Sequence, residues 1–348
     1  MEFKGHREEI VFYDTLGRQK ESWVEVRSHP LTGEISRIIH VPLRKLILPD
    51  LEKMADETKE NCPFCPSRLA EKTPRFHTSL LKEGVLKRGK GILIPNLFPY
   101  DRYCALIILT DAHYVSLGAW EDTDIFDGLM MAREFLSRII EVDDSVRAFS
   151  LNWNFAPHSG SSILHPHIQL SAGAYATNRA RRLMAASYTA MLKGKDIMAE
   201  WINAEREAGV RWCGSEGPWH ITLAFAPRGR FFEINLLHES VGRFPLLGEE
   251  DVMALSRGIT RSLRFVAAAG FASMNLSLFS PLREAGAFHP MVSVSPRACV
   301  GPYHMSDISF QMLIDEFFTL YLPEEEADQF RSAERMFSTS AQRRENVD

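Results

Sequence analysis

Two segments of the chain share one pattern, His165-Pro166-His167-Ile168-Gln169-Leu170-Ser171 and His289-Pro290-Met291-Val292-Ser293-Val294-Ser295. Proline opposes a helix and the alternation that follows is typical of a strand, so each segment predicts a strand that begins at a His-Pro pair. Strand patterns over 91–95, 104–109 and 148–155 and a helical pattern over 122–141 precede the first segment. Strand patterns over 219–225, 231–237 and 274–279 and a helical pattern over 249–269 precede the second. The chain is therefore expected to contain two similar α+β halves.

The spacing of histidines supports an internal duplication. His113 precedes His165 by 52 residues, and His238 precedes His289 by 51. Each interval holds a helix, a strand and a loop, as a repeated unit requires. We expect an N-terminal half over 1–172 and a degenerate C-terminal half over 173–348. The latter would begin with a mostly helical connection and carry the sugar or acceptor side, and the charged tail after Glu324 is expected to fray.

Composition excludes several classes of protein. The 348 residues are 45% hydrophobic and carry a net charge of −5, so no strong field attracts nucleic acid or an anionic membrane. No apolar run approaches the ~20 residues that span a bilayer, and the N-terminus lacks the apolar core of a signal peptide. We expect a cytoplasmic protein without nucleic-acid or membrane partners.

The pair Cys62-Pro63-Phe64-Cys65 has the spacing of a metal-binding turn. A redox pair, or two buried cysteines that pack as small apolar side chains, would have the same spacing. A structural metal needs two further ligands, and His113 and His165 are the candidates. Two thiolates and two imidazoles suit Zn²⁺ better than a hard cation.

His165 and His167 are two residues apart in an extended segment, so their side chains lie on one face. Both could bind metal, or one could be anchored while the other reacts, and a purely structural pair is also possible. If Cys62, Cys65, His113 and His165 complete a tetrahedral site, His167 remains unligated. A neutral imidazole can attack phosphorus and form a reactive phosphoryl adduct, so His167 is a candidate nucleophile.

The residues around the two histidines favour phosphate chemistry. Gln169 shares the face of His167 and could donate to a phosphoryl oxygen. Small and polar residues that could face phosphate oxygens lie between the preceding strand and the histidines; they are Asn154, His158, Gly160, Ser161 and Ser162. A flexible loop would have a similar composition, and no Walker-type or dinucleotide fingerprint occurs.

The segment His165-Pro166-His167-Ile168-Gln169 resembles the His-Pro-His-x-Gln motif of the galactose-1-phosphate uridylyltransferases, the transferase branch of the histidine-triad superfamily. The similarity extends over most of 25–305. It includes Leu31-Thr32-Gly33-Glu34, Cys62-Pro63-Phe64-Cys65, Pro95-Asn96-Leu97-Phe98-Pro99, His113 and Asn154.

This resemblance implies two histidine-triad-like half-folds with antiparallel sheets and flanking helices, and a homodimer. It implies one structural Zn²⁺ on Cys62, Cys65, His113 and His165. It also implies ping-pong transfer of UMP from a UDP-sugar to a sugar 1-phosphate through a nucleotidyl group on His167. Phosphate contacts are implied for Gln169, Ser161, Ser162 and Asn154, and nucleotide contacts for Arg44, Phe64, Asn96 and Phe98.

The chain departs from the family pattern at several positions. Ile47 replaces the second of two early arginines, and Ile163-Leu164 replaces Asn-Pro before the motif. His289-x-Met291 stands where some members hold a second metal through His-x-His, so we expect none there. Pro302-Tyr303-His304 replaces Gly-Tyr-Glu, and the lost carboxylate removes an acceptor for sugar hydroxyls.

Four functions therefore compete. The leading hypothesis is a nucleotidyltransferase, uridylyl rather than adenylyl. The nearest alternative is a phosphorylase of ADP-sugars or dinucleoside polyphosphates that uses inorganic phosphate as acceptor. A hydrolase is disfavoured because Gln169 stands where hydrolases of the superfamily have a third histidine. A zinc-stabilised nucleotide-binding protein without catalysis is the last. Sequence assigns no role to His158 or His289.

Overall fold

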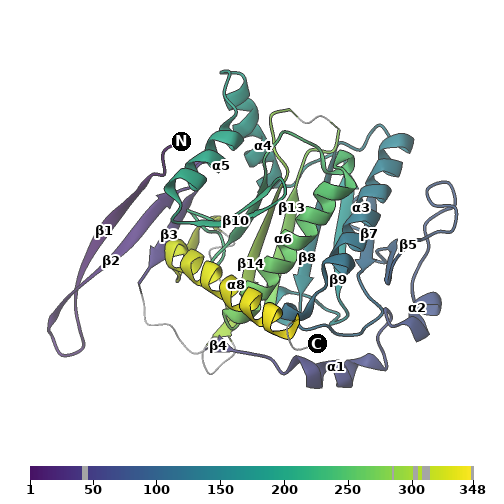
Figure 1. Cartoon of the computed structure of the whole chain (residues 1–348), viewed down its shortest axis with the longest axis horizontal. Helices are drawn as coiled ribbons and strands as arrows, with labels where there is room; N and C mark the ends of the chain where they lie inside the picture. Colours follow the sequence, from purple (N-terminus) through teal and green to yellow (C-terminus); the bar gives the residue numbers. More distant parts are fainter. Residues whose placement is uncertain (41–45, 284–285, 301–304, 308–313, 346–348) are drawn as a thin grey trace.

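The computed structural model describes residues 1–40, 46–283, 286–300, 305–307 and 314–345. Its central feature is a ten-stranded antiparallel sheet with the order β10-β11-β12-β14-β13-β8-β9-β7-β6-β5 (Figure 1). The first half contributes β5 (Leu86–Arg88), β6 (Gly91–Pro95), β7 (Tyr103–Ile108), β8 (Ala148–Phe155) and β9 (His167–Gly173). The second half contributes β10 (Trp212–Glu216), β11 (Trp219–Leu223), β12 (Ile234–His238), β13 (Ser273–Phe279) and β14 (Met291–Arg297).

The two halves repeat one topology. Outward from the middle of the sheet, the first half reads β8-β9-β7-β6-β5 and the second reads β13-β14-β12-β11-β10. The halves meet at the β8–β13 pair, where Asn152 lies opposite Ser277. The equivalent helices α3 (Asp122–Val142) and α6 (Glu249–Ala268) pack against each other. The expected α+β fold of two repeated halves is thus confirmed, while the boundary at 172 and 173 stays a prediction.

The two faces of the sheet have opposite character because successive side chains alternate. Leu151 and Trp153 of β8 are buried on the face that α3 and α6 cover. Asn152 and Asn154 of the same strand lie on the other face. Burial of the apolar face stabilises the fold. The polar side chains of β8 lie on the opposite face of the sheet.

Smaller elements surround this sheet. β1 (Gly5–Tyr13), β2 (Gln19–Ser28), β3 (Ile35–Ile39) and β17 (Phe317–Thr319) form a second sheet, and the β1–β2 hairpin extends away from the body in Figure 1. β4 (Leu46–Ile47), β15 (Cys299–Val300) and β16 (Met305–Ser306) form a third sheet. The expected helical connection consists of α4 (Asn178–Met191) and α5 (Ile197–Ala208). Two short helices, α1 (Leu51–Lys59) and α2 (Pro66–Lys72), flank the cysteine pair.

The prediction that the tail after Glu324 frays is wrong. Residues Pro323–Glu345 form helix α8, which packs on α6, β10 and β11. Ala327, Phe330 and Ala333 recur at every third position and are buried. This helical period makes one face of a highly charged segment apolar, and that face docks on the core.

Two expectations fall outside the described residues, the nucleotide contact of Arg44 and the altered stretch 302–304. Within the described ranges, no helix is both long and apolar enough to cross a membrane.

Candidate functional site

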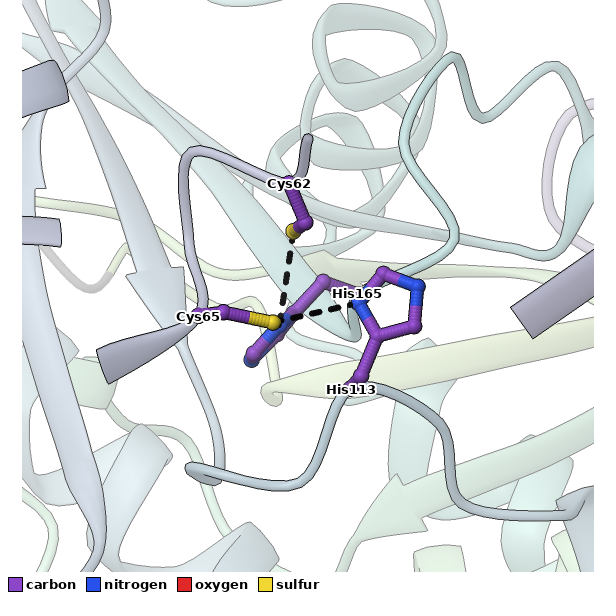
Figure 2. Close-up of side chains that lie close together, drawn as sticks. All are labelled: Cys62, Cys65, His113 and His165. Atoms are coloured by element: carbon purple, nitrogen blue, oxygen red, sulfur yellow. Dashed lines mark hydrogen bonds between the residues drawn. The ribbon is translucent and has the colours of Figure 1, made fainter. Parts of the chain in front are cut away.

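Four side chains predicted to bind metal lie together. The ligand atoms of Cys62, Cys65, His113 and His165 are all within 4.8 Å of one another, and all four residues are buried. The Sγ of Cys65 is 3.4 Å from Nδ1 of His113 and 3.7 Å from Nδ1 of His165. A tetrahedral zinc site with ordinary bond lengths has S···N edges of about 3.6 Å, so the spacing fits such an ion. Figure 2 shows the four side chains pointing toward one another.

Local structure explains how separate segments reach this point. Cys65 is the N-cap of α2, and Pro66 at the first helical position starts the helix directly after the cysteine turn. His113 follows strand β7, and His165 precedes strand β9. Since β7 and β9 are antiparallel neighbours, with Ile108 opposite His167, the end of one and the start of the other are adjacent.

The second nitrogen of each metal-facing imidazole is also held. Nε2 of His165 donates to the carbonyl oxygen of Thr110 at 2.8 Å, and Nε2 of His113 lies 3.0 Å from the hydroxyl of Thr58. The carbonyl only accepts, so the proton of His165 is on Nε2 and the Nδ1 lone pair faces the cysteines. Partners of this kind orient the ligands of protein metal sites.

Burial favours the uncharged forms of His165 and Cys65 in this cluster. It lowers the pKa of His165 to about 4, so the ring is neutral at pH 7. Burial, together with the neighbouring Cys62, raises the pKa of the Cys65 thiol to about 11. A bound cation would reverse this preference and release the thiol proton. The four residues can therefore hold one metal ion.

His167 lies beside the cluster but outside it. Its Nδ1 donates to the carbonyl oxygen of His165 at 2.9 Å, which leaves the lone pair on Nε2. The residue is 6% exposed, and Phe64 packs against its ring edge-on with the ring centroids 5.2 Å apart. Burial lowers the pKa of His167, so the imidazole is neutral at pH 7. The side chain is therefore a neutral imidazole whose lone pair is on Nε2.

Polar residues share the face of His167. Gln169 of β9 lies opposite Asn152 of β8. His167 and Asn154 are each two residues away on the same strands, so alternation places their side chains on the same face as Gln169. Among the described residues, no hydrogen-bond partner is recorded for the amide of Gln169. The amides of Gln169 and Asn154 therefore lie on the same face of the sheet as His167.

The loop after β8 contains the predicted phosphate contacts. It begins at Ala156, whose φ of 68° and ψ of 166° are unusual for a residue with a Cβ, and η2 (Pro157–Ser159) follows. Gly160 has a φ of 92° and is exposed, as is Ser162. The hydroxyl of Ser161 donates to the carbonyl oxygen of Ile163 at 2.7 Å. Ser161 is thus partly committed to the loop itself.

The predicted nucleotide contacts lie in two places. Phe64 is buried against His167, as described above. Asn96 and Phe98 follow β6, and the backbone amide of Asn96 donates to the carbonyl oxygen of Cys104 in β7. Cys104 is four residues before Ile108, the β7 residue opposite His167, so this position is about 13 Å along the strands from His167. Phe98 is 81% exposed, and its amide donates to the side chain of Asn96.

The comparisons with known proteins agree with this architecture. A solved ADP-glucose phosphorylase from Arabidopsis thaliana with bound ADP-glucose has a TM-score of 0.69 and 17% identity, over 88% of this chain and 98% of the other. A GalT-like protein from the same plant has a TM-score of 0.67 and 18% identity over the same shares, and a uridylyltransferase has 0.65 and 19%, over 88% and 97%. The chain has the uridylyltransferase fold. The resemblance seen in the sequence is confirmed at the level of the fold.

Comparison of sequences finds a relative, whose name states no activity. An uncharacterized protein of Archaeoglobus fulgidus is 29% identical over 319 residues, which are 90% of this chain and 94% of that protein. No family model matches the chain.

The equivalent place in the second half is filled by apolar side chains. Met291 occupies the position of His167 and pairs in register with Phe279. Both are buried in a cluster with Leu183 of α4 and with Trp201 of α5. Helices α4 and α5 thus cover in the second half the face that carries the polar residues in the first.

His289, the counterpart of the metal-facing His165, has a carboxylate partner. Its Nε2 lies 3.0 Å from the carboxylate of Asp196, the N-cap of α5, and its Nδ1 donates to the carbonyl oxygen of His238. Sequence reasoning missed Asp196, and it also missed Thr58 and Thr110. No motif links these residues to the histidines, and only the fold brings them together.

Proposed function

We propose that this protein is a nucleotidyltransferase that acts on a nucleoside-diphosphate sugar through a covalent nucleotidyl group on His167. The observation that supports this is the fixed tautomer of His167. Its Nδ1–H is engaged by the His165 carbonyl, so the lone pair is on Nε2, within a face lined by Gln169 and Asn154. Likeness to transferases and phosphorylases of the same fold supports the reaction class.

The reaction consists of two displacements. In the first, the Nε2 lone pair of His167 attacks the α-phosphorus of the nucleotide sugar. An N–P bond forms, the P–O bond to the β-phosphate breaks, and a sugar 1-phosphate leaves. In the second, a phosphate oxygen of the acceptor attacks the same phosphorus, the N–P bond breaks, and neutral His167 is restored. No net proton transfer to the ring is needed, which suits a buried imidazole.

The surrounding residues have separate tasks. Asn154, Gln169 and the loop with Gly160, Ser161 and Ser162 would donate to the phosphoryl oxygens as charge moves onto them. We further propose that Cys62, Cys65, His113 and His165 hold Zn²⁺. When bound, the ion would fix His165, and through its carbonyl the ring of His167. Asn96 and Phe98 would contact the base and ribose.

Labelling tests the proposal directly. The purified protein is incubated with UDP-glucose or ADP-glucose carrying ³²P at the α-phosphorus, and acid-labile label on protein is quantified. Label is expected on His167 and should be absent in His167→Asn. If neither nucleotide sugar labels the wild-type protein, the covalent mechanism is contradicted.

A second candidate is an ADP-sugar phosphorylase, in which inorganic phosphate replaces the sugar 1-phosphate as acceptor. It is favoured by the solved structure with bound ADP-glucose, whose TM-score of 0.69 is as high as those of the uridylyltransferases. Discharge of the labelled protein by phosphate, glucose 1-phosphate or galactose 1-phosphate separates the two. Release of a nucleoside diphosphate with phosphate alone would assign the phosphorylase.

We also propose that the active protein is a homodimer, as the sequence resemblance implies. Light scattering coupled to size exclusion measures the mass in solution, and a single chain of 39.6 kDa would contradict it.

A further inference from the structure

We propose that Asn275 of the degenerate half is a positioning residue for the phosphate site, because it orients the side-chain amide of Asn154 so that its N–H groups face the substrate. This inference rests on the proposed function, since it assumes that a phosphoryl group is bound beside His167. It assigns to the second half a direct part in the chemistry of the first.

The orientation follows from one hydrogen bond across the seam. Asn275 lies opposite Asn154 in the β8–β13 register, and its Nδ2 donates to Oδ1 of Asn154 at 2.7 Å. A primary amide has one acceptor and one donor end, so engagement of the oxygen turns the NH₂ group of Asn154 the other way. That NH₂ group has no hydrogen-bond partner recorded among the described residues, and alternation places Asn154 beside His167. An amide N–H donates to a phosphoryl oxygen, whereas a carbonyl oxygen would repel it.

The amide of Asn275 is itself prevented from turning. Its Nδ2 also donates to the carbonyl oxygen of Ser159 at 3.0 Å, and its Oδ1 accepts from Nη1 of Arg297 at 2.5 Å. Reversing the amide would place donor against donor at Arg297 and acceptor against acceptor at Ser159. Three contacts therefore select one orientation.

Arg297 is in turn fixed by a carboxylate. Its Nε and Nη2 donate to the two oxygens of Asp307 at 2.7 Å each, and the side chain of Asp307 is 2% exposed. Such a two-point contact holds a planar guanidinium rigidly. The chain Asp307–Arg297–Asn275–Asn154 thus runs from the second half to the phosphate side of His167.

The Ser159 contact links the phosphate loop to the same residue. Ser159 is buried, and its hydroxyl donates to the carbonyl oxygen of Ala156, the residue with the positive φ. Asn275 therefore holds both the amide that would contact the phosphoryl group and the start of the loop that would surround it.

The test uses Asn275→Asp. A carboxylate keeps the contact with Arg297 but cannot donate, so Asn154 is expected to reverse and present its oxygen to the phosphate. We expect calorimetry to show affinity for UMP or AMP reduced about 10- to 100-fold, as for loss of a charge-assisted hydrogen bond. Affinity for uridine or adenosine, which lack the phosphate, should be unchanged.

Ser277→Ala is the matched control. It removes another hydrogen bond across the same seam, from Ser277 Oγ to Asn152 Oδ1 at 2.8 Å, and should leave UMP and AMP affinity within about twofold. In an Asn154→Ala background, Asn275→Asp should have little further effect. Arg297→Met frees the Asn275 amide to turn, so it should also weaken phosphate binding. It replaces Asn275→Asp as the test variant if Asn275→Asp does not fold.

The outcomes separate the two proposals. Unchanged nucleotide affinity in Asn275→Asp, an equal loss for nucleoside and nucleotide, or additivity with Asn154→Ala overturns the role of Asn275. If the wild-type protein binds nucleotides but forms no adduct on His167, the covalent mechanism fails and the role of Asn275 in phosphate binding stands. If the folded wild-type protein binds neither UMP nor AMP, both proposals fall.

Discussion

Nδ1 of His167 lies 2.9 Å from the main-chain carbonyl oxygen of His165, the residue whose own Nδ1 faces Cys62 and Cys65. One residue thus connects two kinds of site. Its side chain belongs to the cysteine–histidine cluster, and its carbonyl selects the tautomer of the neighbouring imidazole. The contact thus links the cysteine–histidine cluster to the proposed nucleophile, which is only two positions away.

His167→Asn is expected to abolish nucleotidyl transfer and leave the metal cluster intact. Removal of a covalent nucleophile typically costs more than about a thousandfold in rate. Exchange of label between sugar phosphate and nucleotide sugar measures the rate, and elemental analysis measures the metal. His77→Asn, at an exposed position, is the control and should retain activity. Exchange in His167→Asn at a tenth of the wild-type rate would exclude His167 as the nucleophile.

Cys65→Ala is expected to reduce bound metal from about one ion per chain to a small fraction and to lower Tm, since metal binding contributes to folding free energy. Cys104→Ala removes another buried thiol outside the cluster and should keep the ion. Metal content by mass spectrometry and thermal unfolding with and without chelator check both. Equal metal content in the two variants would show that the cysteine pair is not a metal site.

The repeated elements could be predicted from the sequence because their signals are local. Strand alternation and helical periodicity placed β6, β8, α3 and α6 within a few residues of their observed bounds. The metal residues were predictable for a related reason. Only two residues separate Cys62 from Cys65, and the spacing of His113 and His165 nearly recurs in the second half.

Long-range partners could not be predicted in this way. Asn275 is 121 residues from Asn154, and Asp196 is 93 residues from His289. Each pairing depends on the order of strands or on how α5 docks, and an isolated Asn or Asp in the sequence gives no sign of either. The strand β1 and the helix α1 were also missed. Both are charged and largely exposed: β1 has no buried residue and the nine-residue α1 buries only Leu51, so the apolar signal in each is short.

Thr58→Val is expected to weaken metal binding about 10- to 100-fold without abolishing it, as loss of a hydrogen bond to a ligating histidine generally does. The hydroxyl of Thr58 lies 3.0 Å from Nε2 of His113 and also donates to the carbonyl oxygen of Met54. Thr189→Val is a matched control, because Thr189 makes the same bond within its helix, to Ala185, without a histidine partner. Competition with a chromophoric chelator measures the affinities. Equal affinity in both variants would show that Thr58 does not orient His113.

Glu326→Gln is expected to stabilise the protein at neutral and alkaline pH but not in acid. Burial raises the pKa of Glu326 to about 7, and one of its carboxylate oxygens has no hydrogen-bond partner among the described residues. The raised pKa means that the folded state keeps the proton longer than the unfolded chain, whose Glu titrates near 4.5. Its contribution to stability is therefore complete below pH 4.5 and is lost as pH rises through 7.

The neutral amide of Gln removes this cost, so Glu326→Gln should gain roughly 1–3 kcal/mol at pH 8 and almost nothing at pH 4.5. Urea unfolding at the two pH values measures the difference. Glu207→Gln makes the same substitution at an exposed helical position and should change neither value appreciably. A gain of equal size at both pH values would mean that folding does not raise the pKa of Glu326, and would contradict the prediction.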